Sequence, residues 1–376
     1  MASQDEVQRQ RIMQALRQQV QERRQMARIQ AEAQARAQVQ VRVQAQAQAQ
    51  SASSGGNQSH PRSRKMGSHF DDLPIMEAID VELLNPEPTC TSSFDFACRE
   101  GPLSTVEDCV TSKLRTPAFL HRGLLIAIRA GHVEAVQFLL SHGAPIARHT
   151  PELVLRASPR RQIEIFELFL KHGWTPNNPG FYGAVILPRV IDNIPLLSWF
   201  LAHGADPNLG PQKDFRDRLG ASDTESCVAL ETASARGSLE AVQMLLDAGA
   251  RIQNGTPLHC AAGACPPGVN PHAGRVIPSK GFDADRIPIM SLLVEKGADV
   301  NEKTQSQHMV PQYAIVHAVM AGAMERVKWL IAHGADPYLK GAFGSAVNYA
   351  SFWGAEMTQV IEEALSLKKT SLTIAS

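Results

Sequence analysis

The ten residues FLAHGADPNL at 200–209 return almost unchanged as LIAHGADPYL at 330–339. Both copies contain AHGADP, and they stand 130 residues apart. Two unrelated surface loops would not share so long a phrase, so the sequence predicts an internal repeat. Repeats of 20 to 50 residues build folds in which each unit packs only on its neighbours.

A glycine that follows a leucine-rich segment marks the other copies. It recurs at intervals of 30, 31, 45, 48 and 37 residues, as Gly143, Gly173, Gly204, Gly249, Gly297 and Gly334. We call the residues eight, seven, four and three positions before each of these glycines the stripe positions. Twenty-three of the twenty-four are apolar, against 44% for the chain. This spacing predicts an α-helix with one buried face before each glycine.

The glycines have a conformational reason. A helix often ends in a left-handed residue, which glycine adopts without strain, and the preceding histidines lie at the negative end of the helix dipole; these are His142, His172, His203 and His333. Gly131, Gly237 and Gly322 stand twelve residues earlier and separate a shorter, alanine-rich helix from the second one. Each unit therefore reads as helix, glycine turn, helix, glycine cap and protruding loop.

This pattern resembles the ankyrin repeat. In GTPLHCAA at 255–262, Thr256 can cap a helix, Pro257 fits its first position and Leu258 packs inward. GSLEAVQMLLDAGA at 237–250 and GADVNEK at 297–303 are equally typical of the family. The resemblance covers 94–365 and implies an all-α solenoid of about eight stacked helix-turn-helix units with hairpin-like loops. The wider sequence, including FDFACREGPLSTVE at 94–107, is also similar to uncharacterised ankyrin-repeat proteins of filamentous fungi.

Several units depart from the pattern. The first and last are atypical, as expected for caps that face water on one side. In the fourth unit Pro195 stands where it would begin the second helix. Insertions at 209–226 and 266–285 are predicted to be loops, the second separating the two helices of the sixth unit. Because binding residues are commonly placed on loops, these insertions are candidate interaction sites.

The repeats are flanked by segments of other composition. Residues 1–66 form a low-complexity arm and linker, 67–93 a lead-in, 94–365 the repeat domain and 366–376 a C-terminal tail. Residues 1–50 hold sixteen Gln, ten Ala and eight Arg, and residues 1–65 carry a net charge of +7 against −7 for the remainder. Met13, Leu16 and Val20 share a helical face that later fails, so the arm is either disordered, a fluctuating helix or a helix that self-associates weakly as a coiled coil.

Composition also limits compartment and partners. The start of the chain lacks an apolar signal region, and no run of about eighteen apolar residues follows. Six scattered cysteines are typical of a reducing compartment, so we expect a cytoplasmic or nuclear protein. The acidic repeat region is not expected to bind nucleic acid, and no membrane contact is expected.

No enzyme signature is present in the sequence. It lacks GxxxxGK, GxSxG and HExxH, and no GxGxxG follows a strand. The nearest approach to a metal cluster is His259, Cys260, Cys265 and His272, whose spacing does not match the paired ligands of a zinc site. His259 falls at the usual ankyrin histidine position, which implies a role in the turn network. We therefore expect no catalysis, no cofactor and no metal.

Aromatic and basic residues on the loops are the candidate partner-binding residues, because interfaces are enriched in Trp, Tyr and Arg. They are Trp174, Phe181, Tyr182, Phe215, Arg216, Arg218, Tyr313 and Tyr338. The pattern favours a non-catalytic scaffold or adaptor that binds a protein through the loop and concave face. The alternatives are a transcription-associated nuclear adaptor that uses the Gln-rich arm, and a regulatory subunit of an enzyme.

Overall fold

The computed structural model describes residues 93–112, 114–271, 276–277, 279–304, 311–342 and 344–375, with the backbone alone at 368–375. All of them belong to the second of the two units into which the chain divides, Gly67–Ser376. The predicted arm, 1–66, and the predicted lead-in, 67–93, lie outside the described residues except for Ser93, which begins α3.

Helices account for nearly all regular structure in the described residues. They are α3 (Ser93–Arg99), α4 (Leu103–Thr111), α5 (Pro117–Ala130), α6 (Val133–Ser141), α7 (Thr150–Val154), α8 (Pro159–Lys171), α9 (Ile194–Ala202), α10 (Val228–Arg236), α11 (Leu239–Asp247), α12 (Pro257–Ala262), α13 (Lys280–Glu295), α14 (Ala314–Met320), α15 (Met324–Ala332), α16 (Ala346–Trp353) and α17 (Ala355–Ala375). Short 3₁₀ turns lie at η1 (Phe181–Gly183), η2 (Leu187–Arg189) and η3 (Ile252–Asn254). β structure in this part of the chain is limited to two isolated bridges, Gly210 with Asp223 and Gly341 with Gly344. None of these helices is long and apolar enough to cross a membrane.

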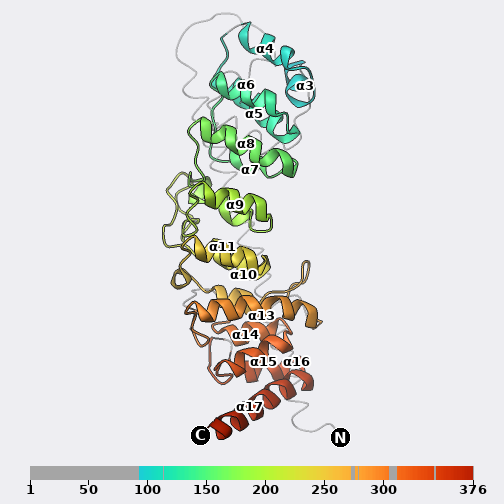
Figure 1. Ribbon diagram of the computed structural model, residues 1–376, viewed down its shortest axis with the longest axis vertical. Helices are drawn as coiled ribbons and strands as arrows, with labels where there is room; N and C mark the ends of the chain where they lie inside the picture. The colour runs from blue at the N-terminus through green and yellow to red at the C-terminus, as the bar shows by residue number, and fades with distance from the viewer. Residues whose placement is uncertain are drawn as a thin grey trace, which may run out of the picture. The chain divides into compact units, whose positions relative to one another are not determined.

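Successive helix pairs stack in chain order, from α3 to α17 (Figure 1). First helices contact first helices, as α10 contacts α12 and α12 contacts α14, while second helices contact second helices, as α11 contacts α13 and α13 contacts α15. The result is a first-helix layer and a second-helix layer. In the fourth unit the 3₁₀ turn η2 replaces the first helix and contacts α10. The predicted all-α solenoid of about eight helix-turn-helix units is confirmed.

The stripe positions form the core between the layers. All but four of the twenty-four are buried, and the remaining four are partly buried and pack against the core; these are Leu170, Leu201, Leu246 and Val294. The one polar stripe residue, Arg326, is also buried. Burial of one large apolar side chain of this kind stabilises a fold by about 1.5–3 kcal/mol, so the periodic stripe contributes substantially to stability.

Each capping glycine is left-handed, with φ between 80° and 102° over the six positions. In three units the side chain of the histidine before the capping glycine bonds to the helix that precedes it. The Nδ1 groups of His142, His203 and His333 donate to the carbonyls of Phe138, Trp199 and Trp329, and each ring packs on the aromatic ring of that residue. Each of these carbonyls also accepts from the backbone N–H of the same histidine, so the side-chain bond reinforces the last turn of the helix. Pro195, as predicted, lies in the first turn of α9, behind the cap Asn193.

Asparagines in the loops join one unit to the next. Each side chain donates to the carbonyl of the next capping glycine and accepts from the N–H two residues beyond it, at distances of 2.8–3.0 Å. The three are Asn177 with Gly204 and Asp206, Asn208 with Gly249 and Arg251, and Asn301 with Gly334 and Asp336. Because both amide groups are used, each asparagine fixes the spacing of adjacent loops.

Some local predictions are wrong. Thr256 precedes α12 but makes no side-chain capping bond; its N–H instead donates to Glu231 Oε1. The insertion at 266–285 is not wholly a loop, because α13 begins at Lys280. Gly237, by contrast, separates α10 from α11 as predicted; its φ is −76°, and a Cβ there would lie 2.8 Å from the Ala233 carbonyl oxygen. The helix α17 also runs on into the segment predicted as a tail.

Candidate functional site

Five of the eight candidate residues lie on two loops that the fold brings together. Phe181 and Tyr182 precede α9, and Phe215, Arg216 and Arg218 belong to the insertion before α10. We call residues 178–184 and 210–223 the loop platform. Backbone bonds join its two loops, because the Tyr182 N–H donates to the Arg218 carbonyl at 2.9 Å and the Gln212 N–H donates to the Tyr182 carbonyl at 2.8 Å.

Side-chain hydrogen bonds also join the two loops of the platform. Ser222 Oγ donates to the Gly183 carbonyl at 2.6 Å. Arg148, from the loop between α6 and α7, donates through Nη1 to the carbonyls of Gly180 at 3.0 Å and Gly220 at 3.3 Å, one on each loop. Gly183 itself has φ 75°, and a Cβ there would collide with the Ala221 carbonyl. The platform is therefore a fixed structure rather than two independent loops.

The two exposed aromatics of the platform are strained. Tyr182 has φ 56° and Phe215 has φ 51°, and no other non-glycine residue of the described part has a positive φ. Their exposed fractions are 36% and 58%, and their ring centroids are 6.0 Å apart. Left-handed backbone at a bulky residue costs about 1–3 kcal/mol and is commonly retained at functional sites. An exposed aromatic pair held at this cost is a candidate contact for a partner.

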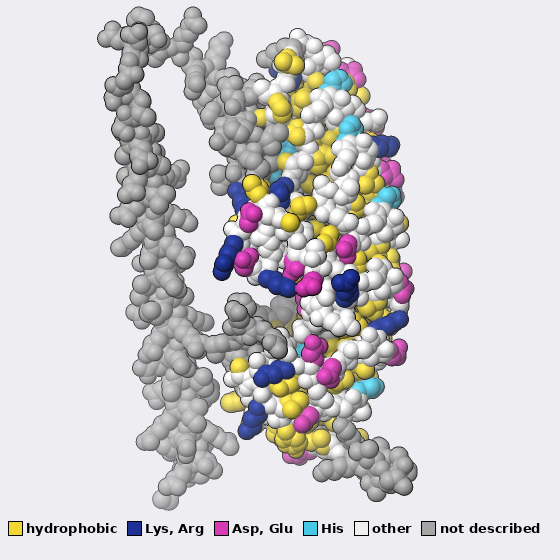
Figure 2. Space-filling model, turned by 90° about the vertical axis from the view of Figure 1, so that its left-hand side faces the viewer, with side chains coloured by type: hydrophobic (Ala, Val, Ile, Leu, Met, Phe, Trp, Pro, Cys, Tyr) yellow, Lys and Arg dark blue, Asp and Glu magenta, His cyan; other side chains and the backbone are white. Residues whose placement is uncertain are grey.

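Charges of both signs surround the pair. Arg216 lies 3.3 Å from Asp214, Lys213 lies 3.4 Å from Asp223, and the Arg218 guanidinium lies 4.2 Å from the centre of the Phe181 ring. The side of the molecule that carries these loops shows Lys or Arg and Asp or Glu side chains close together near its middle, with apolar side chains between them (Figure 2). Exposed ion pairs of this kind contribute about 0–1 kcal/mol, so they favour specificity more than stability.

The other three candidates do not join the platform. Trp174 is buried, with 5% of its surface exposed, and its ring stacks on Phe166 at 5.3 Å. Tyr313 is buried at the start of α14. Tyr338 is exposed but lies in the loop between α15 and α16, three units further along. The expectation that Trp174 and Tyr313 are exposed on loops is wrong, because both side chains are buried in the core.

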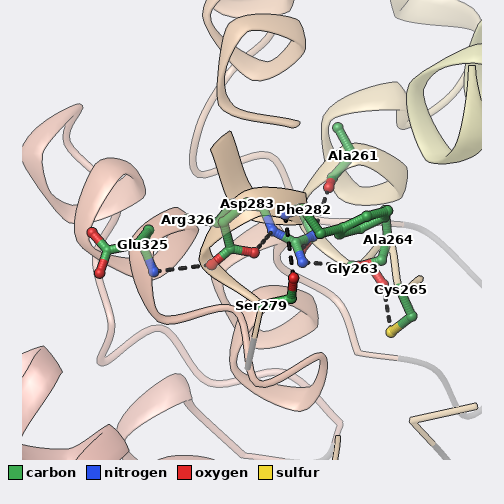
Figure 3. Close-up of polar contacts among 10 residues, drawn as sticks. Ala261, Gly263, Ala264, Cys265, Ser279, Phe282, Asp283, Glu325 and Arg326 are labelled. Atoms are coloured by element: carbon green, nitrogen blue, oxygen red, sulfur yellow. Dashed lines mark hydrogen bonds and ion pairs between the residues drawn. The ribbon is translucent and has the colours of Figure 1, made fainter. Parts of the chain in front are cut away.

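A buried ion pair joins the sixth and seventh units and was missed by the sequence analysis. Arg326 Nε donates to Asp283 Oδ1 at 2.8 Å, and its Nη groups donate to the carbonyls of Ala261, Ala262 and Ala264 at 2.6–3.0 Å (Figure 3). We call Asp283 and Arg326 the buried clamp. Burial lowers the pKa of the Arg326 guanidinium, and Asp283 opposes that shift. The available signal was that Arg326 is the one polar stripe residue.

Burial shifts the pKa values of His259 and Cys260, two of the four residues nearest to a metal cluster in the sequence. Burial, and then the neighbouring His317, lowers the pKa of His259 to about 4, and its Nε2 lies 3.3 Å from the Gln312 carbonyl. Burial, and then Glu231, raises the pKa of Cys260 to about 12, which keeps the thiol protonated and unreactive at neutral pH. No group of three or more potential metal ligands occurs in the described residues, and His272 lies outside them.

Comparison with known proteins follows this geometry. The ankyrin repeat family model matches residues 124–150. The ankyrin repeat domain of human ASB11 is 18% identical, covering 73% of this chain and 97% of that one, with a TM-score of 0.38. The ankyrin repeat domain of Bcl-3, described as a unique member of the IkappaB protein family, is 19% identical, covering 65% of this chain and 84% of that one, with a TM-score of 0.36. No curated protein matches, so the resemblance to fungal proteins stays a prediction.

The matched residues span the end of α5, the turn at Gly131, α6 and the loop after its capping glycine. The same arrangement of paired helices, glycine caps and stacked loops recurs through the described residues. The fold is therefore an ankyrin-repeat solenoid.

Proposed function

We propose that this chain is a non-catalytic scaffold that binds a partner protein through the loop platform. The single observation that carries the proposal is the Tyr182–Phe215 pair, two exposed aromatics held in strained backbone by bonds between two loops. Interfaces are often dominated by a few rigid aromatic and arginine anchors. The platform offers both, with Arg216 and Arg218 beside the pair, and no association-dependent folding is needed to present them.

The proposal also includes the absence of catalysis and a location in the cytoplasm or the nucleus. Ankyrin solenoids generally serve as interaction modules, and the buried, protonated thiols of Cys227 and Cys260 offer no nucleophile. The cysteines of the described residues are free, which suits the cytoplasm or nucleus.

A second candidate, a transcription-associated nuclear adaptor, is favoured by the sixteen Gln and net positive charge of the N-terminal arm. If the tagged full chain is absent from the nuclei of cells, this alternative is excluded. A role as an enzyme's regulatory subunit rests on no feature of the structure.

The proposed function is tested by comparing proteins captured by the full-length wild type with those captured by Phe215→Gly/Arg216→Ala. Glycine takes the left-handed conformation freely, so this variant removes both anchors while relieving strain, and its melting temperature should not fall. The matched control is Phe352→Ala/Arg160→Ala, which removes an exposed Phe and an exposed Arg elsewhere. Partners lost by the platform variant and kept by the control support the proposal; identical capture by both variants and the wild type excludes it.

A further inference from the structure

The second-helix layer has a shallow groove between α11 and α13, with a volume of about 730 Å³. The lining residues are Leu239, Glu240 and Gln243 of α11 and Ile287, Pro288, Ser291, Leu292 and Glu295 of α13. The α13 residues recur at helical spacing, so they line one face of that helix. A hollow between two helices with an apolar floor suits the apolar face of a partner helix, which inserts side chains one turn apart.

The charge of the groove is one-sided. Its lining includes the carboxylates of Glu240 and Glu295 and no Lys or Arg. Both side chains are exposed, and neither takes part in an ion pair among the described residues. Asp247 of α11, also exposed, accepts a hydrogen bond from Gln243 at 2.7 Å and adds a third negative charge to those of Glu240 and Glu295. An acidic rim around apolar side chains attracts an occupant whose apolar face is flanked by basic residues.

The wall formed by α13 has two further features that suit a docked helix. Pro288 stands inside the helix and has no N–H, so the carbonyl of the exposed Ala284 lacks the donor that an α-helix normally supplies. The N-terminal turns of α13 are fixed by the buried clamp, since Asp283 binds both Arg326 and the Glu325 N–H (Figure 3). The groove is therefore preformed, which lowers the entropic cost of binding.

We infer that the groove between α11 and α13 binds an amphipathic helix of a partner protein, apolar on one face and flanked by Lys or Arg. This surface is separate from the loop platform and does not depend on it. The scaffold then holds two partner segments at once, one on the loops and one on the second-helix layer.

The test uses two fluorescent fourteen-residue probes with leucines on one helical face, flanked by lysines in one probe and by glutamates in the other. Binding to the full chain is followed by fluorescence anisotropy at physiological ionic strength. The lysine probe should bind at least about tenfold more tightly than the glutamate probe, and Glu240→Lys/Glu295→Lys should weaken it by at least about tenfold. Leu239→Gln should weaken both probes, because it removes an exposed apolar contact.

The matched control is Glu167→Lys/Glu362→Lys, which changes the net charge equally at exposed positions of α8 and α17. Its binding of the lysine probe should stay close to that of the wild type, as should binding by Phe215→Gly. Circular dichroism melting confirms that each variant is folded. Equal binding of the two probes, unchanged binding by Glu240→Lys/Glu295→Lys, or an equal loss in the control would overturn the inference.

Discussion

Removal of the Asp283 carboxylate would leave a buried arginine without its counter-ion. The side chains of Arg326 and Asp283 are 2% and 3% exposed, so water cannot replace the lost partner. Breaking such a pair from one side costs about 3–5 kcal/mol. The Asp283 carboxylate also accepts from the Glu325 N–H in the first turn of α15, where a negative charge contributes a further 0.3–1 kcal/mol or so. We expect Asp283→Ala to lower the free energy of unfolding by about 3–6 kcal/mol in total.

A double-mutant cycle separates this pair from its surroundings. Arg326→Met alone leaves the carbonyls of Ala261, Ala262 and Ala264 without a donor, each at a cost of about 1–3 kcal/mol where water cannot reach. Asp283→Ala/Arg326→Met removes both charges together. The double variant should therefore be less destabilised than the sum of the single variants by about 2 kcal/mol or more.

Hydrogen exchange read by mass spectrometry suits this measurement, because stacked repeats open locally and a single global transition is not assured. Amides of α12, α13 and α15 should exchange faster in Asp283→Ala, while those of α6 and α8 serve as an internal control. Urea unfolding supplies the free energies. A loss below about 1 kcal/mol in Asp283→Ala would show that this ion pair does not compensate a buried charge, and the reasoning would fail.

Three other predictions follow from the core and the caps. Because the pKa of His259 falls from 6.5 to about 4 on folding, the unfolded chain takes up the proton first as the pH falls, and the free energy of unfolding should drop by about 3 kcal/mol between pH 6.5 and 4. Urea titrations of His259→Leu should lack this pH-dependent component. The same pH dependence in this variant and the wild type would contradict the prediction. Gly249→Val should lower the free energy of unfolding by about 1–3 kcal/mol through backbone strain alone, since φ is 91° and a Cβ there has no neighbour within 4 Å. Gly237→Ala should lower it by a similar amount, because its Cβ would collide with neighbouring atoms. A wild-type melting temperature in either variant would reject the explanation given for that variant. Trp174→Ala should lose about 3–5 kcal/mol in thermal or urea unfolding, and a smaller loss than 1 kcal/mol would mean that it is not a core residue.

Much of the fold was predictable because stacking imposes a period on the sequence. Each unit must bury the same helical face and turn at the same place, so the stripe and the left-handed glycine recur and are visible without any structure. Pro195 illustrates the point: its fixed φ and missing N–H suit the first turn of a helix wherever that helix packs. The stripe and the left-handed cap hold in the six units that end at Gly143, Gly173, Gly204, Gly249, Gly297 and Gly334.

The residues that failed prediction depend on neighbours far away in the chain. Trp174 follows a capping glycine, where a loop residue would be exposed, yet its ring fills a space bounded by Phe166 and Phe200 of two different helices. The contact between Tyr182 and Phe215 likewise depends on bonds between two loops, which no periodicity records. Asp283 lies in an insertion, so nothing in the repeat pattern could pair it with Arg326.

The loop platform includes residues where the sequence departs from its period, and the groove adjoins such a departure, because α13 begins inside the second insertion. A residue within the period must serve the stacking of units, whereas an inserted residue is free of that constraint and its position is set by new contacts. The insertion at 209–226 supplies Phe215 and the bonds that hold the loop platform. The insertion at 266–285 supplies the early turns of α13. One stripe position holds Arg326 in place of an apolar residue, and the bond from Arg326 to Asp283 fixes these turns. A groove for a partner helix requires that the extended α13 hold one orientation. This requirement explains why the buried charge of Arg326 is retained.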